Sequence, residues 1–474
     1  MPDAQHPFYP VDQTHDPSLK SWIESANDPS SEFPIQNLPF CRAQRLDEIE
    51  AEGGDASMAP EFLATRIGEV IVDLEALADA GLLDAVRDED GESVMGFALG
   101  AFLDEAEPKV RVAFRRQLSA LLSTLDDRLR ENDALREEAL TPVDRCVVRP
   151  AHEPRDYTDF YASVYHATNV GSMFRPGNAL LPNYKHVPIG YHGRASTVVP
   201  SGTPIVRPKG QQSPAEEGGT PSFAPCRMLD YELEVGFVVG RPNPMGETIP
   251  LARAEAHILG LCLVNDWSAR DVQKWEYQPL GPFLAKNFAT TVSPYLVTLE
   301  ALAPFRTPAF ERPAADPAPL PYLTDDRDRA LGGIDLTLEV YLRSAQMREQ
   351  GLEPVRISRG SFRDMYWTIA QLLTHHASNG CAMEPGDLLA SGTVSGKTRE
   401  SRGCLLELTW DGDAFANPPV LVPGTQRTPI QLPTGETRTF LADGDEVVLR
   451  GFCEREGYRR IGFGDCTGII TPAK

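Results

Sequence analysis

The stretch 229-LDYELEVGFVV-239 alternates apolar and polar side chains, which is the period-two pattern of a β-strand. One face of this strand is apolar, and the other carries the carboxylates of Asp230, Glu232 and Glu234. Like charges about 7 Å apart along one face repel each other unless water or a cation lies between them. The pattern leaves two interpretations, the solvated face of an outer strand or half of a cation site. The segment alone favours the solvated face.

Strand patterns of the same kind recur along the second half of the chain, where Gly- and Pro-rich turns separate them. They are HILGLCLVND (257–266), IDLTLEVYLR (334–343), CLLELTW (404–410) and DEVVLRGFC (445–453). The main exception is the helix pattern MYWTIAQLLTHHASNG (365–380), which ends on glycine. We therefore predict a mainly β domain over residues 151–474, built as a sandwich or roll, with surface loops at 303–323 and 422–437.

Residues 1–150 are interpreted as a smaller first domain. Short strands and turns are expected from residue 33 to residue 75, including Val70–Leu74, and helical periodicity follows over residues 93–138. Residues 140–160 are predicted to be a linker into the second domain, and residues 1–30 to be loosely ordered. Five leucines form one apolar stripe of the expected helix: Leu118, Leu121, Leu122, Leu125 and Leu129.

The charge balance excludes several classes of function. Lysine and arginine number 45 against 68 aspartates and glutamates, a net charge of −23, which suits cations and disfavours nucleic acid or anionic lipid. The start of the chain lacks the features of a signal peptide, and no apolar run approaches the roughly 20 residues that span a bilayer. Eight scattered cysteines without a C-x-x-C pair predict reduced thiols in a cytoplasmic protein and no zinc site.

The segment 156–196 holds polar residues that packing does not explain. A single histidine in a loop is more often a surface residue, but here aromatic residues and an arginine surround it. That composition, in a segment without a strong helix or strand period, favours a functional loop. The candidate residues of this segment are Asp159, Tyr161, His166, Arg175 and Tyr191.

The segment 263–291 is the other candidate. A strand ends at Asp266, and a short helix is expected to follow it, with Arg270, Gln273 and Tyr277 on one polar face and Lys286 beyond a turn. An ordinary solvated helix would explain these charges equally well. Neighbouring aromatic residues predict burial instead, and buried cations need partners. These aromatic residues are Trp267, Trp275, Tyr277, Phe283 and Phe288.

Four carboxylates in these three segments form a candidate ligand set: Asp159, Glu232, Glu234 and Asp266. Ligand sets made of oxygen atoms alone select hard cations, Ca²⁺ or Mg²⁺. Four carboxylates exceed the charge of one divalent ion, and Lys286 and Arg270 are available to balance the excess. The spacing alone does not establish that these positions converge.

Several motifs of the chain together resemble the fumarylacetoacetate hydrolase family. They include DYTDFY (156–161), GYHGRAS (190–196), NDWSARD (265–271) and PGDLLASGT (385–393), with FPIQNLPF (33–40) near the N-terminus. The resemblance implies a small SH3-like N-terminal β-barrel domain and a large C-terminal β-sandwich roll. It also implies a homodimer that ends tyrosine and phenylalanine catabolism by hydrolysing a carbon–carbon bond, which gives fumarate and acetoacetate.

The resemblance also assigns roles to residues. It implies His166 as general base with Glu407 orienting it, and Arg270, Gln273 and Lys286 as the groups that hold developing negative charge. It places a metal ion, Ca²⁺ or Mg²⁺, on the four carboxylates, and a second, weaker site, for Mg²⁺, on Asp266, Lys286 and Thr290. The implied substrate-binding residues are Tyr161, Arg175, Tyr191, Gln273, Tyr277 and Thr393.

Two rival functions remain open at this stage. One is another enzyme of the same superfamily, which would decarboxylate, hydrate or isomerise an oxo-acid on a similar metal site. His166, Glu407 and the N-terminal domain argue against it. The other is a non-catalytic Ca²⁺-binding protein, which would have no need of Lys286, Arg270 and His166 in one pocket.

Overall fold

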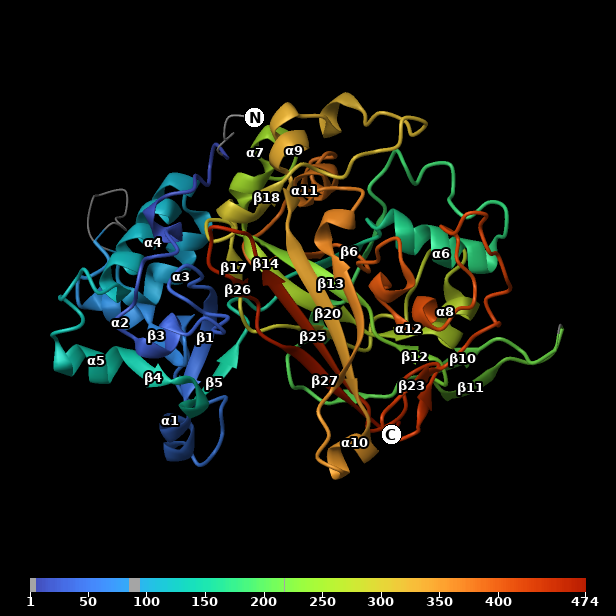
Figure 1. Ribbon diagram of the computed structural model, residues 1–474, viewed down its shortest axis with the longest axis horizontal. Coiled ribbons are helices and arrows are strands. Elements are labelled where there is room, and N and C mark those ends of the chain that lie inside the picture. Colours follow the sequence, from blue (N-terminus) through green and yellow to red (C-terminus); the bar gives the residue numbers. More distant parts are fainter. Residues whose placement is uncertain (1–5, 85–93, 217) are drawn as a thin grey trace.

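A five-stranded antiparallel sheet organises the N-terminal part of the chain in a computed structural model, which describes residues 6–84, 94–216 and 218–474 (Figure 1). Its strand order is β4-β3-β2-β1-β5, and helices α2 to α5 pack beside it. The strands are β1 (Phe40–Arg45), β2 (Phe62–Ile67), β3 (Val70–Asp73), β4 (Leu140–Pro142) and β5 (Cys146–Arg149). The helices are α1 (Leu46–Ala51), α2 (Leu74–Asp79), α3 (Gly96–Glu105), α4 (Pro108–Leu122) and α5 (Asp133–Ala139).

The predictions for this region hold in part. Strand β3 lies where Val70–Leu74 was expected, and helices occupy most of 93–138, of which residue 93 lies outside the described residues. Helix α1 was not predicted. The leucine stripe is wrong at Leu125, because α4 ends at Leu122 and leaves Leu125 86% exposed, whereas Leu118 and Leu121 are buried.

The segment 140–160 is regular structure, so the predicted linker is wrong over most of its length. Strands β4 and β5 complete the N-terminal sheet, and β6 (Tyr157–Phe160) joins the next sheet. Only residues 150–156 connect the two sheets. No period-two pattern of apolar residues is visible in this segment, because each strand is only three or four residues long.

Residues 6–32 are ordered, against the prediction for residues 1–30, of which 1–5 lie outside the described chain. They contain two 3-10 turns, Gln13–His15 and Glu24–Asn27. The buried Tyr9 hydroxyl donates to the Glu255 carbonyl at 2.8 Å and accepts from Arg111 of α4. This arm therefore contacts both the N-terminal helices and the second half of the chain.

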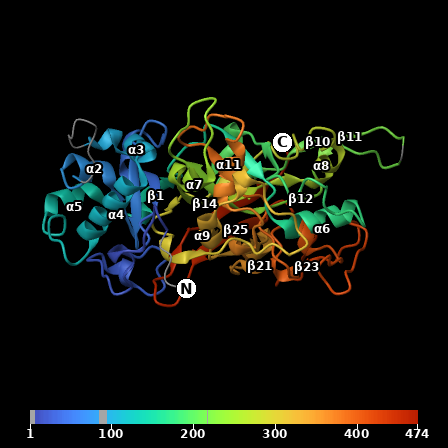
Figure 2. The same ribbon diagram turned by 90° about the horizontal axis from the view of Figure 1, so that it is seen from above.

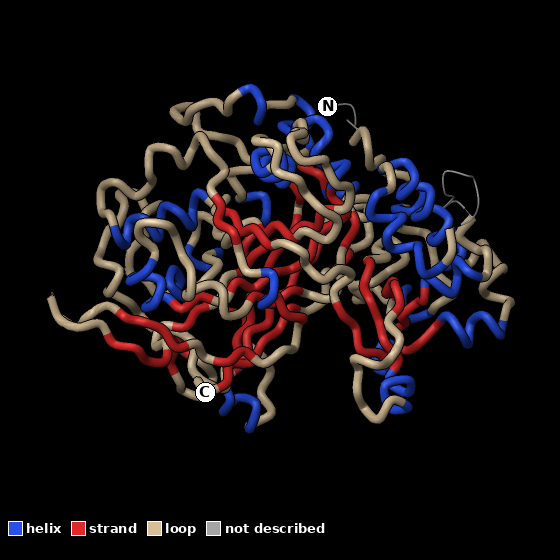
Figure 3. The backbone as a smooth tube through the Cα atoms, turned by 180° about the vertical axis from the view of Figure 1, so that it is seen from behind, coloured by secondary structure: helices blue, strands red, loops and turns tan. Residues whose placement is uncertain are grey.

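The second half of the chain is built on two larger sheets (Figure 3). The eight-stranded sheet has the order β7-β6-β22-β13-β14-β16-β8, with β17 also paired to β14. Besides β6, its strands are β7 (Gly190–His192), β8 (Val198–Pro200), β13 (Leu233–Val239), β14 (Ile258–Asp266), β16 (Thr290–Val292), β17 (Val297–Thr298) and β22 (Leu388–Ala390).

The six-stranded sheet has the order β21-β20-β25-β27-β9, with β26 also paired to β25. Its strands are β9 (Ile205–Val206), β20 (Leu336–Arg343), β21 (Val355–Ser361), β25 (Glu446–Cys453), β26 (Ile461–Gly462) and β27 (Cys466–Thr471). Short pairs of strands lie outside both sheets: β10 (Lys209–Gln212) with β11 (Ser222–Pro225), β12 (Leu229–Asp230) with β15 (Ser268–Ala269), β18 (Arg306–Thr307) with β19 (Gly333–Ile334), and β23 (Ile430–Gln431) with β24 (Thr437–Arg438).

Strand β13 is buried on both faces, which overturns the solvated-face interpretation of 229–239. Val235 and Phe237 belong to the core shared with Leu338 of β20, on the side of the six-stranded sheet. Val238 belongs to the core that includes Leu118 of α4, on the side of the N-terminal helices. The eight-stranded sheet thus lies between two layers (Figure 2), and the acidic positions of β13 are enclosed with it.

The remaining helices are short. They are α6 (Val164–Phe174), α7 (Leu251–Ala254), α8 (Arg270–Glu276), α9 (Asp326–Leu331), α10 (Ala345–Glu349), α11 (Ile369–His376) and α12 (Leu405–Leu408). The predicted helices at 365–380 and after Asp266 are confirmed as α11 and α8. The predicted strand at 404–410 is wrong, since residues 405–408 form α12. None of the helices in the described residues is long and apolar enough to cross a membrane.

Candidate active site

Three carboxylates from neighbouring strands converge at one end of the eight-stranded sheet. Asp159 lies on β6, Glu234 on β13 and Asp266 at the end of β14. Strand β22 lies between β6 and β13, and β13 pairs with β14, so the three strands belong to four consecutive strands of one sheet. One oxygen from each carboxylate lies within 4.8 Å of the others, and all three side chains are buried.

This cluster has oxygens that no protein group satisfies. Asp159 Oδ1 and both Glu234 oxygens are buried without a hydrogen-bond partner among the described residues. Tyr191 donates to Asp266 Oδ2 at 2.6 Å and to Asp159 Oδ2 at 3.1 Å, and Tyr157 also donates to Asp159 Oδ2. Burial first, and then the neighbouring carboxylates, raise the pKa values of Asp159 and Glu234 well above their usual range. Such a set of oxygens fits a hard divalent cation.

Glu232, the fourth predicted ligand, points to a different set of partners. Its carboxylate pairs with Lys286 and with Arg270 Nη2 at 2.7 Å. Burial would raise the pKa of Glu232, but the charges of Lys286 and Arg270 outweigh it and hold the pKa below its usual value. Lys286 Nζ also pairs with Asp266 Oδ2 at 2.5 Å, and Thr290 Oγ1 donates to Asp266 Oδ1 at 3.2 Å. Lys286 therefore joins Glu232 to the three-carboxylate cluster.

Asp230 is fully buried and does not face solvent, in contrast to the first interpretation of its strand. It accepts from Arg270 Nε at 2.9 Å and from the backbone N–H groups of Leu405 and Leu406, at 2.8 and 3.0 Å. These two N–H groups begin helix α12, so the Asp230 carboxylate caps that helix from a distant strand. Arg270 Nη1 in turn donates to Gln273 Oε1 at 3.2 Å.

His166 and Glu407 form a buried pair beside these carboxylates. His166 Nδ1 lies 2.5 Å from Glu407 Oε2, and His166 Nε2 lies 3.8 Å from Glu232 Oε1. Glu407 also accepts from Asn169 Nδ2 at 2.9 Å and from Ser395 Oγ at 2.8 Å. Burial opposes ionisation of Glu407, but His166 and these donors outweigh it and lower its pKa to about 2. Glu407 is therefore a fixed, ionised partner for the imidazole.

Local sequence explains how His166 is presented. Ser163 caps α6 by accepting from the His166 backbone N–H at 3.2 Å, which starts the helix three residues before the imidazole. Asn169 follows His166 at i+3 and thus shares its helix face. That spacing could have identified Asn169 from sequence, whereas Ser395 and Asp230 reach the site only through the tertiary fold.

Side-chain contacts connect some of the predicted substrate-binding residues, Tyr161, Tyr191 and Gln273, with this centre. The Tyr161 ring packs edge-on against His166, with centroids 5.3 Å apart. Burial first, and then the Glu407 and Glu232 charges, raise the pKa of its hydroxyl above the usual value. Arg175 ends α6, and its Nε is buried without a partner among the described residues. Tyr277 ends α8, and Thr393 is buried in the loop after β22.

The sequence predicted that the aromatic residues of 263–291 are buried. The structure confirms this for only some of them. Trp267 is buried and donates to Thr291 Oγ1 at 2.8 Å. Trp275 and Phe283 are 42% and 67% exposed, because α8 and the loop that follows it lie at the edge of the molecule (Figure 1). Burial of Arg270 and Lys286 comes from the carboxylates and sheets instead.

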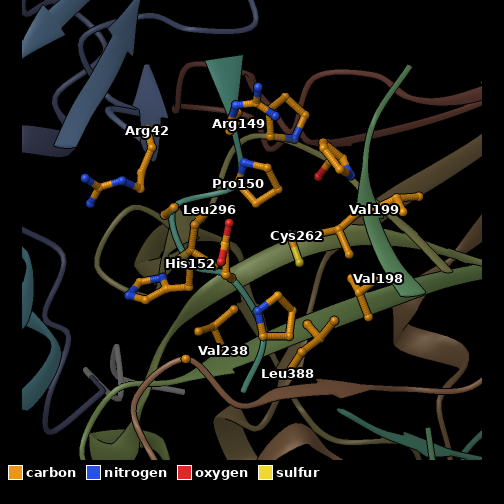
Figure 4. Close-up of a pocket in the computed structure, with 18 of the residues that line it drawn as sticks. Arg42, Arg149, Pro150, His152, Val198, Val199, Val238, Cys262, Leu296 and Leu388 are labelled. Carbon is orange, nitrogen blue, oxygen red and sulfur yellow. The ribbon is translucent and has the colours of Figure 1, made fainter. Parts of the chain in front are cut away.

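A separate cavity of about 540 Å³ lies between the N-terminal sheet and the eight-stranded sheet (Figure 4). Val238, Cys262 and Leu388 form part of its apolar floor, and Arg42 and Arg149 lie at its rim. None of the three clustered carboxylates lines it, and neither does His166 or Glu407. This cavity is therefore separate from the buried polar cluster.

The chain matches two family models that together span most of its length. Residues 156–470 match the model described as fumarylacetoacetate (FAA) hydrolase, C-terminal, and residues 36–149 match fumarylacetoacetase, N-terminal. The fumarylacetoacetase of Bos taurus is 44% identical over 457 residues, covering 96% of this chain and 99% of that protein. Those of Homo sapiens and Arabidopsis thaliana are 44% and 43% identical, also covering 96% of this chain and 99% of each relative. On this evidence the chain belongs to the fumarylacetoacetase family.

Proposed function

We propose that the chain hydrolyses the carbon–carbon bond of fumarylacetoacetate to give fumarate and acetoacetate, as the last step of tyrosine and phenylalanine catabolism. Relatives that carry the name fumarylacetoacetase and match the whole chain support this activity. The observation that carries the proposal is the His166–Glu407 pair, whose second imidazole nitrogen lies 3.8 Å from Glu232, and Lys286 joins Glu232 to the cluster of buried carboxylates with unpartnered oxygens.

In this mechanism His166 is the general base. Glu407 fixes the Nδ1–H tautomer, so Nε2 is left free to take a proton from the attacking water. The ionised Glu407 then stabilises the imidazolium that forms, since it lies 2.5 Å from Nδ1. Neutral imidazole is the side chain best suited to this step near neutral pH.

We assign Arg270, Gln273 and Lys286 to stabilising the negative charge that develops on the substrate. Each well-placed donor of this kind stabilises a transition state by about 3–4 kcal/mol. Arg270 and Lys286 are already fixed by Asp230, Glu232 and Asp266, so little reorganisation is needed when charge appears on the substrate.

The substrate is held by a second group of side chains. The planar guanidinium of Arg175 suits a terminal carboxylate, and its unpartnered Nε supports that role. The tyrosine and threonine hydroxyls supply further donors around the reacting carbons. We assign substrate contact to Tyr161, Arg175, Tyr191, Gln273, Tyr277 and Thr393.

A Ca²⁺ or Mg²⁺ ion is assigned to Asp159, Glu234 and Asp266, with Glu232 beside them as the fourth candidate ligand. A divalent cation bound there would supply the positive charge that chelates and polarises a β-diketone. We assign Lys286 and Thr290 to holding Asp266 rather than to a second Mg²⁺, because the Lys286 ammonium already balances that carboxylate.

The remaining assignments concern the whole protein. We propose a domain boundary at residue 150, with the five-stranded sheet as an SH3-like domain and residues 151–474 as a sandwich roll. We also propose a cytoplasmic location, which the eight unpaired cysteines support. A homodimer is proposed through the α8 surface, defined as five exposed apolar side chains on α8, the loop after it and strand β11: Phe223, Trp275, Leu280, Phe283 and Leu284.

The test follows the loss of fumarylacetoacetate by its diketone absorbance. We expect His166→Ala to lower kcat by about 10²- to 10⁴-fold. His375→Ala is the matched control, because the His375 imidazole pairs with the Tyr322 hydroxyl and not with the residues of the site described above, and it should retain activity. Chelation should abolish hydrolysis, and Ca²⁺ or Mg²⁺ should restore it. Turnover of His166→Ala near that of the unmodified protein, or products such as pyruvate or CO₂, would contradict the proposal.

A further inference from the structure

Cys404 lies against the His166–Glu407 pair, and the reaction described above does not use it. Its Sγ donates to Glu407 Oε2 at 3.2 Å. One ligand atom each from His166, Cys404 and Glu407 lies within 4.8 Å of the others, and all three side chains are buried. Thiolate, imidazole and carboxylate are the donor types that zinc accepts in proteins.

We propose that His166, Cys404 and Glu407 form a second metal site, for a thiophilic divalent ion such as Zn²⁺ or Cd²⁺, and that occupying it inhibits the enzyme. Binding releases one proton to solvent, from the Cys404 thiol, and the proton on His166 Nδ1 moves to Nε2, so the imidazole stays neutral. The resulting thiolate and carboxylate charges balance the ion. The inhibitory part of this inference rests on the proposed role of His166 as base.

The geometry is close to that of a bound ion. Bonds of about 2.0–2.3 Å in a tetrahedral arrangement put neighbouring ligand atoms roughly 3.2–3.8 Å apart. Cys404 Sγ and Glu407 Oε2 already have a separation of 3.2 Å, and the 2.5 Å between His166 Nδ1 and Glu407 Oε2 has to widen. Asn169 and Ser395 already donate to Glu407, as partners behind a ligand do in metal sites.

Donor chemistry separates this site from the carboxylate cluster. Asp159, Glu234 and Asp266 offer only oxygen and suit hard cations, whereas Cys404 adds a soft sulfur ligand. An ion on Nδ1 would remove the hydrogen bond to Glu407 and leave the imidazole proton on Nε2, so Nε2 could no longer take a proton from water. Because the three groups are buried, an ion reaches them only when the structure opens locally, and inhibition should develop slowly.

The test compares the full-length protein with its Cys404→Ser variant, which keeps a donor to Glu407 but has no sulfur. Both proteins are first saturated with Ca²⁺, and Cd²⁺ is then added as the only other metal. The rate of each protein with Cd²⁺ is divided by the rate of the same protein without Cd²⁺. We expect at least about a tenfold loss for the unmodified protein and less than about a twofold loss for Cys404→Ser. Cys381→Ser, which removes a partly exposed thiol far from the pair, should respond like the unmodified protein.

A spectroscopic measurement tests the site without relying on activity. Cd²⁺ should give a sulfur-to-metal charge-transfer band in the ultraviolet that is absent in Cys404→Ser and weakened in His166→Ala. Equal inhibition of Cys404→Ser, or an unchanged band in that variant, would overturn the proposal and place the ion elsewhere. A Cys404-dependent band without inhibition would overturn its inhibitory part. Failure of His166→Ala to lose turnover would instead refute the proposed mechanism and leave the band to test the site.

Discussion

At the scale of single residues, Glu234 is a poorly compensated carboxylate of the site, because it is fully buried and neither of its oxygens accepts a hydrogen bond from the described residues. Glu234→Gln removes that charge. In metal-free protein we expect the free energy of unfolding to rise by about 1–3 kcal/mol, since an unpaired buried charge is costly. Adding Ca²⁺ should raise the melting temperature of the unmodified protein but not that of Glu234→Gln.

Thermal unfolding with and without Ca²⁺ measures both effects. Glu131→Gln is a suitable control, because Glu131 is an exposed residue of the N-terminal domain and its loss should change neither response. A Glu234→Gln variant that is less stable than the unmodified protein without metal, yet still responds to Ca²⁺, would show that Glu234 is not a ligand.

Asp328 of α9 gives a pH dependence outside the active site. Burial, together with the Glu255 charge, raises the pKa of Asp328 to about 7 against the hydrogen bond from Thr368. The pKa of Asp328 is higher in the folded state than in the unfolded state. Its contribution to the stability of the fold is therefore fully present below about pH 4 and is lost as pH rises through about 7. Asp328→Asn should therefore increase stability by about 1–4 kcal/mol at about pH 8 and flatten the slope between these values.

Urea denaturation at several pH values measures this slope. Asp326→Asn, at an exposed neighbour in the same helix, should leave the slope unchanged. Identical slopes for the unmodified protein and Asp328→Asn would mean that Asp328 titrates near its ordinary pKa.

At the scale of elements, Asp230 connects strand β12 to helices α8 and α12. It holds Arg270 of α8 and the first N–H groups of α12, the helix that carries Glu407. Asp230→Asn weakens both contacts without leaving a cavity. Since a displacement of about 1 Å in a catalytic group can cost about 10²-fold in rate, we expect a loss of that order in kcat with a smaller change in KM.

Steady-state kinetics of Asp230→Asn, with circular dichroism to verify folding, make this measurement. Asp387→Asn is the matched control, because Asp387 is a buried carboxylate that also accepts backbone N–H groups, from Asp156 and Glu384, but does not contact the site. Full activity in Asp230→Asn would mean that α12 is positioned by its own packing alone.

At the scale of the whole molecule, the α8 surface is the contiguous apolar feature next to the site. Trp275 contacts Gln211 of β10, whose strand partner in β11 is Phe223, and Leu280 and Phe283 follow in the loop after α8. Placing charge there with Leu280→Lys and Phe283→Lys should prevent association by desolvation and repulsion. Light scattering after size exclusion should then give the mass of one chain, against two for the unmodified protein.

The control for this prediction is Leu125→Lys. Leu125 is as exposed as the residues of the α8 surface but lies on the N-terminal domain, so this variant should keep the mass of two chains. A double variant that also keeps two chains would place the interface on another face.

Much of this protein follows from its sequence. Period-two patterns predicted β13, β14, β20 and β25, and the polar face after Asp266 predicted α8, because these signals are set by neighbouring residues. Motifs with fixed residue types also identified the family, which the comparisons confirm. The sequence named Asp159, Glu232, Glu234 and Asp266 as one candidate ligand set, and the resemblance paired His166 with Glu407; the structure brings three of the four carboxylates together.

Other features depended on tertiary structure. The pattern of residues 404–410 predicts a strand. The structure has a helix at residues 405–408 instead, and Asp230, which lies 175 positions before Leu405, caps it. The acidic face of β13 read as solvated, but the N-terminal helices and a second sheet enclose it. Local pattern determines which conformation a segment prefers, whereas burial, charge pairing and distant hydrogen bonds depend on which segments meet. Only the folded chain decided that Glu232 pairs with Lys286 and that Cys404 lies against Glu407.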